Sequence, residues 1–284
     1  MIKMRYLLTT FIGLAIAWTA TAESYHETVR KTIPLPEGND AVLILENISG
    51  RMVVESYEGE QVELEINEEY NTDSKEELAE IKRKIYMTFN THGDTVDVFT
   101  DGVCGCARNN RYRNSHWEKC NYDYRFDFKV RVPARANLLV STINNGDINI
   151  SGVSGRIVAR NVNGGIFIDR ISGPADIHTI NGNVEVRYAK NPDKHSKYYS
   201  LNGNVNVYFH PGLSADLHFK SFQGDLYTNF DITENLPPAR LTTTTKGHNG
   251  TTYRIEDRTA VRIGNGGTLL DFETFNGDVF VRKI

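Results

Sequence analysis

The residues best suited to chemistry lie between Asp101 and Asn121, a stretch without apolar periodicity that holds all three cysteines of the chain. In an oxidising compartment Cys120 would pair with either Cys104 or Cys106, which would close the irregular loop with a disulfide. Three thiolates together with His116 could also hold zinc, although the spacing matches no standard zinc motif. We expect a disulfide, one unpaired thiol and no bound metal or cofactor.

The same loop gathers basic and aromatic side chains. Guanidinium groups bind carboxylates or phosphates through paired hydrogen bonds, and indole faces stack on sugars. An acidic glycan or a partner protein would suit such a loop, whereas a solvated surface loop is the simpler interpretation. The candidate ligand-binding residues are Arg108, Arg111, Tyr112, Arg113, His116 and Trp117.

Catalytic groups are harder to find in the rest of the chain. Asp169, Asp176 and Glu185 are spread through the repeats described below, and His178 and His218 are expected to point outward from strands. The sequence contains no nucleophile elbow, P-loop, HExxH or dinucleotide-binding fingerprint. We therefore predict no catalytic residue and a protein that is not an enzyme.

A recurring hexapeptide determines where any of these residues can lie. It reads NGDINI from Asn145, NGGIFI from Asn163, NGNVEV from Asn181, NGNVNV from Asn202, QGDLYT from Gln223 and NGDVFV from Asn276, at spacings of 18, 18, 21, 21 and 53 residues. A period near 20 is typical of solenoids and strand arrays, in which one unit cannot bury its apolar face without its neighbours.

Two arrangements of the Asn-Gly turns are possible. Asn-Gly between apolar strands favours a hairpin and hence an antiparallel meander. A solenoid uses the same dipeptide as a corner in every coil, and the equal phase of successive units favours it. Stacked asparagines could then hydrogen-bond along a column, and we expect the apolar residue before each Asn or Gln to point inward. The predicted structural turns are Asn145, Gly146, Asn163, Gly164, Asn181, Gly182, Asn202, Gly203, Gly224, Asn276 and Gly277. Three of the six corners lack the third-position aspartate of a calcium-binding turn, so we interpret the corners as structural turns.

The segment before the repeats has a different pattern. It predicts strands over 41–47, 51–57, 61–70, 85–90 and 95–100, one helix over 74–85 that begins with a capping box at Ser74 and Glu77, and an aromatic strand over 122–133. Residues 229–264 break the repeat and predict an inserted hairpin or a broadened coil. The fold class is all-β: a β-solenoid resembling a right-handed β-helix (132–284), with an N-terminal β-rich cap (23–131) that carries one short helix and the Cys-rich loop.

The first 22 residues predict export. Lys3 and Arg5 precede an apolar run, and Ala20-Thr21-Ala22 forms a small-residue cleavage signal. No later segment is long and apolar enough to predict a membrane-spanning helix. A net charge of −4 gives no reason to expect a nucleic-acid partner. We expect a protein of the periplasm, the outer cell envelope or the extracellular space.

Three stretches carry a resemblance to a known family: residues 46–66, residues 129–155 and the Asn-Gly units through Val281. The chain resembles the bacterial exported β-strand-repeat family of unknown function labelled putative adhesin, whose adhesin-like head domains are β-helical. The resemblance implies a non-enzymatic exported cell-envelope or surface protein, a binding or structural module whose partner would be a glycan or an envelope protein. The alternative is a carbohydrate-active enzyme, a polysaccharide lyase or hydrolase, on the same scaffold.

Overall fold

The computed structural model describes residues 23–38, 40–72, 74–102, 122–247 and 250–284, and within these ranges the side chains of all but Glu23 and 240–257. The described chain is nearly all β, arranged in two large sheets with one helix, α1 (Lys75–Lys84). Sheet A has the strand order β1 (Glu23–Pro34), β4 (Gln61–Thr72), β7 (Asp123–Pro133), β3 (Met52–Tyr57), β9 (Ile148–Ser151), β11 (Ile166–Ile171), β13 (Val184–Tyr188), β15 (Val205–Phe209), β21 (Val279–Lys283) and β17 (Leu226–Thr228). Sheet B has the order β18 (Ile232–Gly247), β19 (Gly250–Ile263), β16 (Ala215–Gln223), β20 (Thr268–Asn276), β14 (Ser196–Asn202), β12 (Ala175–Asn181), β10 (Ile157–Asn163), β8 (Asn137–Thr142), β2 (Val42–Glu46), β6 (Thr95–Gly102) and β5 (Ile85–His92).

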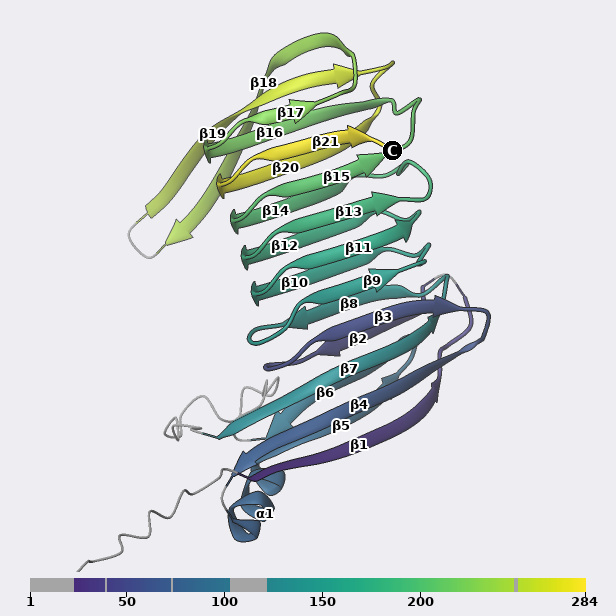
Figure 1. Cartoon of the computed structure of the whole chain (residues 1–284). Coiled ribbons are helices and arrows are strands. Elements are labelled where there is room, and N and C mark those ends of the chain that lie inside the picture. The colour runs from purple at the N-terminus through teal and green to yellow at the C-terminus, as the bar shows by residue number, and fades with distance from the viewer. Residues whose placement is uncertain (1–22, 39, 73, 103–121, 248–249) are drawn as a thin grey trace, which may run out of the picture.

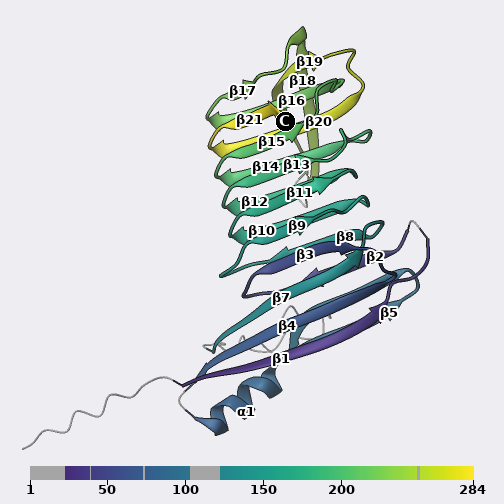
Figure 2. The same ribbon diagram turned by 45° about the vertical axis from the view of Figure 1, so that its right-hand side comes forward.

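From β8 to β17 the chain alternates between the two sheets, laying one strand in each before it moves on (Figures 1 and 2). We call one such pair of strands a coil. Like strands of neighbouring coils pair in parallel, for example β10 with β12 and β11 with β13. The register follows the sequence repeat, since Ile157 lies opposite Ala175 and Ile166 opposite Val184. These parallel pairs differ from the antiparallel pairs that a meander would make.

The core fills the space between the two sheets. Strands such as β13 and β15 alternate buried and partly exposed residues, which is the period-2 pattern of a strand with one face inside. The aromatic row of β7 belongs to this core, because Tyr124, Phe126, Phe128 and Val130 are all buried.

The coils do not stack in the order of the sequence. The last coil, β20 and β21, lies between the coil β14–β15 and the coil β16–β17, so the chain passes to the end of the stack and then returns (Figure 1). Residues 229–264 supply the excursion. They form the antiparallel hairpin β18–β19, which extends sheet B past β16. Of the two forms predicted for this insertion, the structure has the hairpin.

The opposite end of the stack contains an additional coil. Strand β2 pairs in parallel with β8, and β3 pairs in parallel with β9, so both sheets continue across residue 132. Antiparallel strands then extend the sheets outward, β4 and β1 in sheet A and β5 in sheet B. Helix α1 begins where the capping signal places it, since the Ser74 hydroxyl accepts a hydrogen bond from the Glu77 amide at 3.0 Å.

Candidate binding face

The predicted ligand loop and the cysteines fall outside the described residues. This applies to Cys104, Cys106, Cys120, Arg108, Arg111, Tyr112, Arg113, His116 and Trp117. The site residues that the structure does describe lie at the corners of the coils and on the outer faces of the two sheets.

The corner is the turn that leads from a sheet B strand to the following sheet A strand, and its asparagines form a ladder. The Asn181 amide nitrogen donates to the Asn163 side-chain oxygen at 2.9 Å, and Asn202 and Asn276 continue the column at 2.8 Å each. At the first turn the ladder uses Asn144, which accepts from Asn163 at 2.8 Å. Asn145 is an additional residue with φ 60°, so the first turn is shifted by one residue from the predicted repeat.

Corner glycines stack directly on one another. A Cβ atom at Gly164 would overlap the carbonyl oxygen of Gly146, and one at Gly182 would overlap that of Gly164. Gly203, Gly277 and Gly224 continue the same column, and Gly50 begins it below Gly146. Neighbouring coils therefore approach closely enough at this point to exclude any side chain.

A buried polar column lies just inside the corner. The Thr179 hydroxyl donates to the Gly164 carbonyl at 2.8 Å, and the Ser200 hydroxyl donates to the Gly182 carbonyl at 2.8 Å. Corner carbonyls that face the interior need such donors, because a buried polar group without a partner is costly. The equivalent residues in the other coils are Thr142, Asn161 and Thr274, all nearly inaccessible to solvent.

The expectation that an apolar residue points inward before each Asn or Gln is wrong. Since side chains alternate along a strand, the polar residue that faces inward turns its successor outward. Phe222 and Phe275 are accordingly 71% and 43% exposed and stack on each other with ring centroids 4.7 Å apart. The recurring Thr, Ser or Asn two residues before each corner Asn or Gln is the sequence signal for the inner column.

Third-position side chains hold the next coil in place. The Asp147 carboxylate accepts a hydrogen bond from the Gly165 backbone N–H at 2.7 Å. The Asn183 side-chain oxygen accepts one from the Asn204 backbone N–H at 2.9 Å. Asn204 and Asp278 make the same contact one coil further along. No group of three His, Cys, Asp or Glu side chains suited to a metal ion occurs among the described residues.

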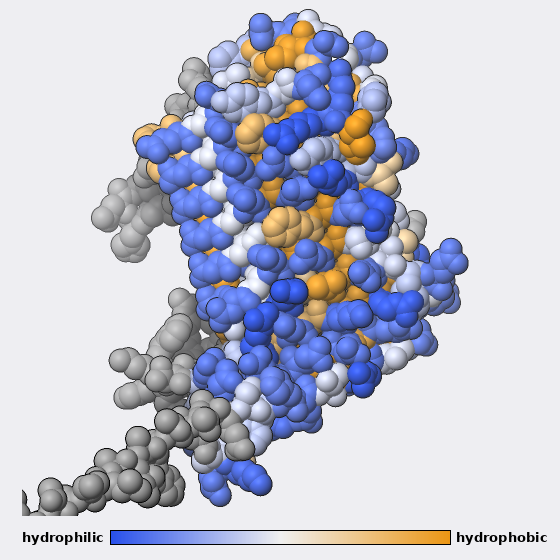
Figure 3. All heavy atoms as spheres, viewed as in Figure 1, coloured by the Kyte–Doolittle hydropathy of each residue, from blue (hydrophilic) through white to orange (hydrophobic). Residues whose placement is uncertain are grey.

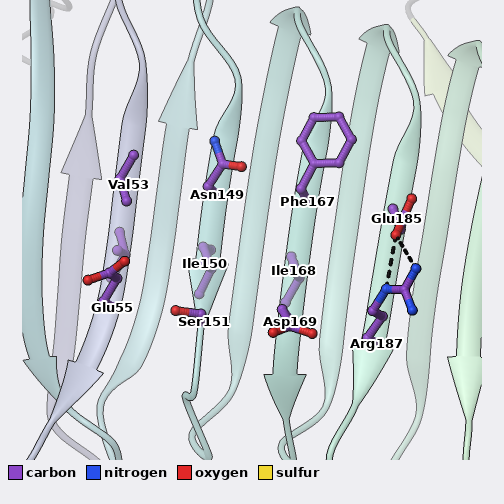
Figure 4. A pocket seen from close by; sticks show the side chains of 11 residues that line it. Val53, Glu55, Asn149, Ile150, Ser151, Phe167, Ile168, Asp169, Glu185 and Arg187 are labelled. Atoms are coloured by element: carbon purple, nitrogen blue, oxygen red, sulfur yellow. Dashed lines mark hydrogen bonds and ion pairs between the residues drawn. The ribbon is translucent and has the colours of Figure 1, made fainter. Parts of the chain in front are cut away.

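The outer face of sheet A carries a shallow depression of about 280 Å³ over β3, β9, β11 and β13. Figure 3 shows hydrophobic residues gathered along the middle of the visible face, among hydrophilic ones. Figure 4 shows two rows of outward side chains that cross the strands of the depression. The first row is Val53, Asn149, Phe167 and Glu185, and the second is Glu55, Ser151, Asp169 and Arg187.

Phe167 lies at the centre of this depression. Its side chain is 38% exposed, and Figure 4 shows the ring face-on, lying along the sheet between Asn149 and Glu185. Gly165 leaves room for this orientation, because a Cβ atom there would stand 2.7 Å from a ring carbon of Phe167. Further along the same sheet aromatic rings contact neighbouring side chains: Tyr227 and Phe280 stack at 5.1 Å, and the Arg282 guanidinium lies 4.5 Å from the centre of the Phe280 ring.

Two of the three carboxylates in the depression are paired with arginines. Arg187 donates twice to one oxygen of Glu185, at 2.9 and 3.0 Å, and its guanidinium lies 4.1 Å from the centre of the Tyr208 ring. Asp169 pairs with Arg170 at 2.6 Å. Three carboxylates, with Glu55 included, against two arginines leave the depression with a formal charge of −1.

The structure separates the acidic and histidine candidates between the two outer faces. Asp169 and Glu185 meet in the sheet A depression, whereas Asp176, His178 and His218 lie on the outer face of sheet B. There Asp176 pairs with Arg160 at 3.0 Å. Partial burial and then the positive charge of Arg160 lower the pKa of His178, whose ring meets Tyr199 edge-on at 4.1 Å.

Phe167, Asn149, Ser151 and Glu55 are members of the depression that sequence reasoning missed. They come from three different coils, and only the strand register places them in adjacent positions. The outward position of Phe167 in NGGIFI could be read from the alternation, but its neighbours across the sheet could not.

No family model matches the sequence, and neither does any curated protein. Three solved structures are similar to the fold over most of its length. A putative cell adhesion protein from Clostridium sporogenes shares 9% identity at a TM-score of 0.44 and covers 92% of this chain and 100% of its own. A putative adhesin from Bacteroides fragilis shares 8% identity at a TM-score of 0.31 and covers 91% of this chain and 97% of its own. A putative lipid binding protein from Parabacteroides distasonis shares 12% identity at a TM-score of 0.26 and covers 91% of this chain and 96% of its own. Similarity at this level assigns neither a family nor a function.

None of the helices in the described part of the chain is both long and apolar enough to cross a membrane.

Proposed function

We propose that this chain is a non-enzymatic, exported binding module of the bacterial cell envelope or surface, adhesin-like in architecture, and that the sheet A depression is its contact surface. The observation that carries the proposal is the ring of Phe167, which is 38% exposed at the centre of a depression lined by both polar and apolar residues. Among the described residues no aromatic ring of a neighbouring coil stacks on Phe167, unlike Phe222 and Phe275, and exposed aromatics beside polar groups are typical of binding surfaces.

The scaffold we propose is a β-solenoid over 132–284 with an N-terminal cap over 23–131, and the cap adds the coil β2–β3 to the stack. Support comes from the parallel register of the coils and from the columns of asparagine and glycine at the corners. Each coil contacts mainly its two neighbours, so outward residues can change without disturbing the stack. Such a scaffold presents a broad, stiff face.

Export and a second contact remain parts of the proposal. The basic and apolar start of the chain supports a signal peptide over residues 1–22. The loop from Arg108 to Trp117 would add a variable contact beside the scaffold. An Arg111→Ala, Trp117→Ala double variant tests that loop, and unchanged binding would remove it from the proposal.

Retention on bacterial envelope material tests the proposed function. The chain from residue 23 onward would be sedimented with purified envelopes, as wild type, as Phe167→Ala with Asn149→Ala, and as Phe280→Ala. We expect the wild type and Phe280→Ala to be retained equally and the depression variant to remain in the supernatant. Equal retention of all three proteins would show that the depression is not the contact surface.

The carbohydrate-active enzyme remains the second candidate, because Glu55, Asp169, Glu185 and Arg187 line the same depression. Glycoside hydrolysis uses a pair of carboxyl groups, one of which keeps its proton in apolar surroundings. Here the side chains of Asp169 and Glu185 are 43% and 35% exposed, and each is held by an arginine. This arrangement favours binding over catalysis.

Incubation with polysaccharides separates the two candidates. The binding module would release no new reducing ends and no unsaturated products over a long incubation. If the wild type releases such products and both Glu55→Gln and Asp169→Asn do not, the result would support the enzymatic function in place of the binding function.

A further inference from the structure

We infer that the sheet A depression binds an uncharged saccharide chain, with the Phe167 ring as the surface on which one sugar stacks. The inference rests on the proposed function and names the ligand class of the same site. Three properties of the depression carry it: an open aromatic face, a mixed set of hydrogen-bonding groups, and a charge that does not attract anions.

The first property is the exposed ring of Phe167 beside the polar groups of the depression. Apolar C–H groups on one side of a sugar ring pack against an aromatic face, so the face must be free. Phe280 is stacked between Tyr227 and Arg282, and the guanidinium groups of Arg187 and Arg282 both lie over the ring of Tyr208. Phe222 and Phe275 stack on each other through one face each; Phe222 stays 71% exposed, but neither residue lines the depression. Phe167 has Asn149 and Glu185 as its neighbours across the sheet and turns its face outward (Figure 4).

The second property is the set of polar groups around the ring. The Asn149 amide can donate and accept, the Ser151 hydroxyl can do both, and the carboxylates of Glu55, Asp169 and Glu185 accept. Sugar hydroxyls likewise donate and accept, so they can satisfy both kinds of group. A purely apolar ligand would leave these groups without partners as they lose water, at a cost in free energy.

The third property is charge. The carboxylates outnumber the arginines, and Arg187 is already engaged by Glu185 and Tyr208. An acidic glycan would therefore meet net repulsion, whereas an uncharged one would not. The expectation of an acidic glycan concerned the loop of Arg108 to Trp117 and does not extend to this face.

An extended peptide is a poorer occupant. Peptides that bind a sheet by strand addition need a free edge, and β11 is paired on both sides, with β9 and with β13. Its backbone groups are therefore already used within sheet A.

The size of the depression suits a chain of sugars. Four adjacent strands at about 4.8 Å separation extend over roughly 14 Å, measured from the first to the last. A flat site of this width, open to solvent, would contact several successive sugars lying across the strands. The ligand would then be an internal segment of a polysaccharide.

Two measurements test the inference. In the first, wild-type protein and variants are titrated with neutral hexasaccharides of glucose, xylose, mannose and N-acetylglucosamine, and with oligogalacturonate as the acidic comparison. We expect at least one neutral probe to bind, binding to weaken roughly tenfold or more in Phe167→Ala, and the acidic probe to bind least. Phe167→Trp should retain binding and report it by fluorescence, and Phe280→Ala should match the wild type.

In the second, envelope retention is repeated after periodate oxidation, which cleaves sugar diols and leaves proteins largely intact. Loss of retention after oxidation supports the inference. Retention that depends on Phe167 but survives oxidation overturns the saccharide while the proposed function stands. Retention that does not depend on Phe167 overturns both, and preferential binding of oligogalacturonate overturns the uncharged class. Thermal unfolding of each variant checks that it is folded.

Discussion

The corner of the coils and the sheet A depression are built from the same repeats, yet they use their polar residues in opposite ways. At the corner the residue types recur from coil to coil, and each side chain bonds to the coil beside it. In the depression the equivalent positions change from valine to asparagine to phenylalanine to glutamate. Recurring residues are therefore used to build the stack, and residues that vary at outward positions are available to a ligand.

This difference has a physical origin. A side chain that bonds to its counterpart in the next coil requires the counterpart to be of a matching type, so the ladder and the inner column stay uniform. An outward residue on a sheet face has water as its alternative partner, which places little constraint on its type. Variants at the corner should accordingly lower stability, whereas variants in the depression should weaken binding and leave stability nearly unchanged.

The largest effect is expected for Gly182→Ala. The new methyl group would overlap the Gly164 carbonyl oxygen, so the coils would have to separate. We expect a loss of about 3–5 kcal/mol in the free energy of unfolding, or failure to fold.

Gly212→Ala is the control for that variant, because no atom lies within 4 Å of the added group and only its φ of 83° is unfavourable. It should cost about 1–2 kcal/mol. Equal losses in the two variants, measured by denaturant unfolding, would contradict the close approach of the coils.

Thr179→Val should have the next largest effect. Valine keeps the shape of threonine but leaves the buried Gly164 carbonyl without the donor that now stands 2.8 Å away. The expected loss is about 1–3 kcal/mol, and Thr179→Ser, which keeps the hydroxyl, should lose less. A valine variant as stable as the wild type would show that the inner column does not stabilise the corner.

Asn181→Ala removes two side-chain hydrogen bonds from the ladder, one to Asn163 and one from Asn202. Because the ladder is exposed, water can replace these bonds, and we expect a loss of about 1 kcal/mol. Urea unfolding should therefore rank this variant below Thr179→Val. The reverse order would mean that the outer ladder, not the inner column, holds the corner.

The smallest effect concerns pH on the outer face of sheet B. The pKa of His178 is lowered in the folded protein, first by burial and then by Arg160, so the unfolded chain binds the proton more readily. Stability that is present above the ordinary histidine value of 6.5 should decline as the pH falls through that value toward the lowered pKa. His178→Gln should reduce this decline in unfolding measured against pH, and an unchanged decline in that variant would contradict the role of His178.

Much of the fold could be predicted from the sequence because it is local. The alternation in the repeats predicts strands, Ser74 and Glu77 place the start of the helix, and the aromatic side chains of Tyr124 and Phe126 indicate a buried face. The inner column was misassigned because the corner carbonyls that require it are backbone groups, and the sequence does not show which way they face. The shift from Asn145 to Asn144 has a similar cause, since an additional residue in a turn leaves no trace in the strand pattern.

The sequence by itself determined the period of the coil, the residue types at its corners and the alternation of buried and exposed positions, because these depend on neighbours a few residues away. Only the tertiary structure decided that the last coil lies inside the stack and that Phe167 shares a surface with Asn149 and Glu185. The order and register of strands depend on contacts between residues far apart in the chain, and a repeated sequence offers many nearly equivalent pairings. The packing of whole coils selects one of these pairings, and the selected pairing brings the residues of the candidate site together.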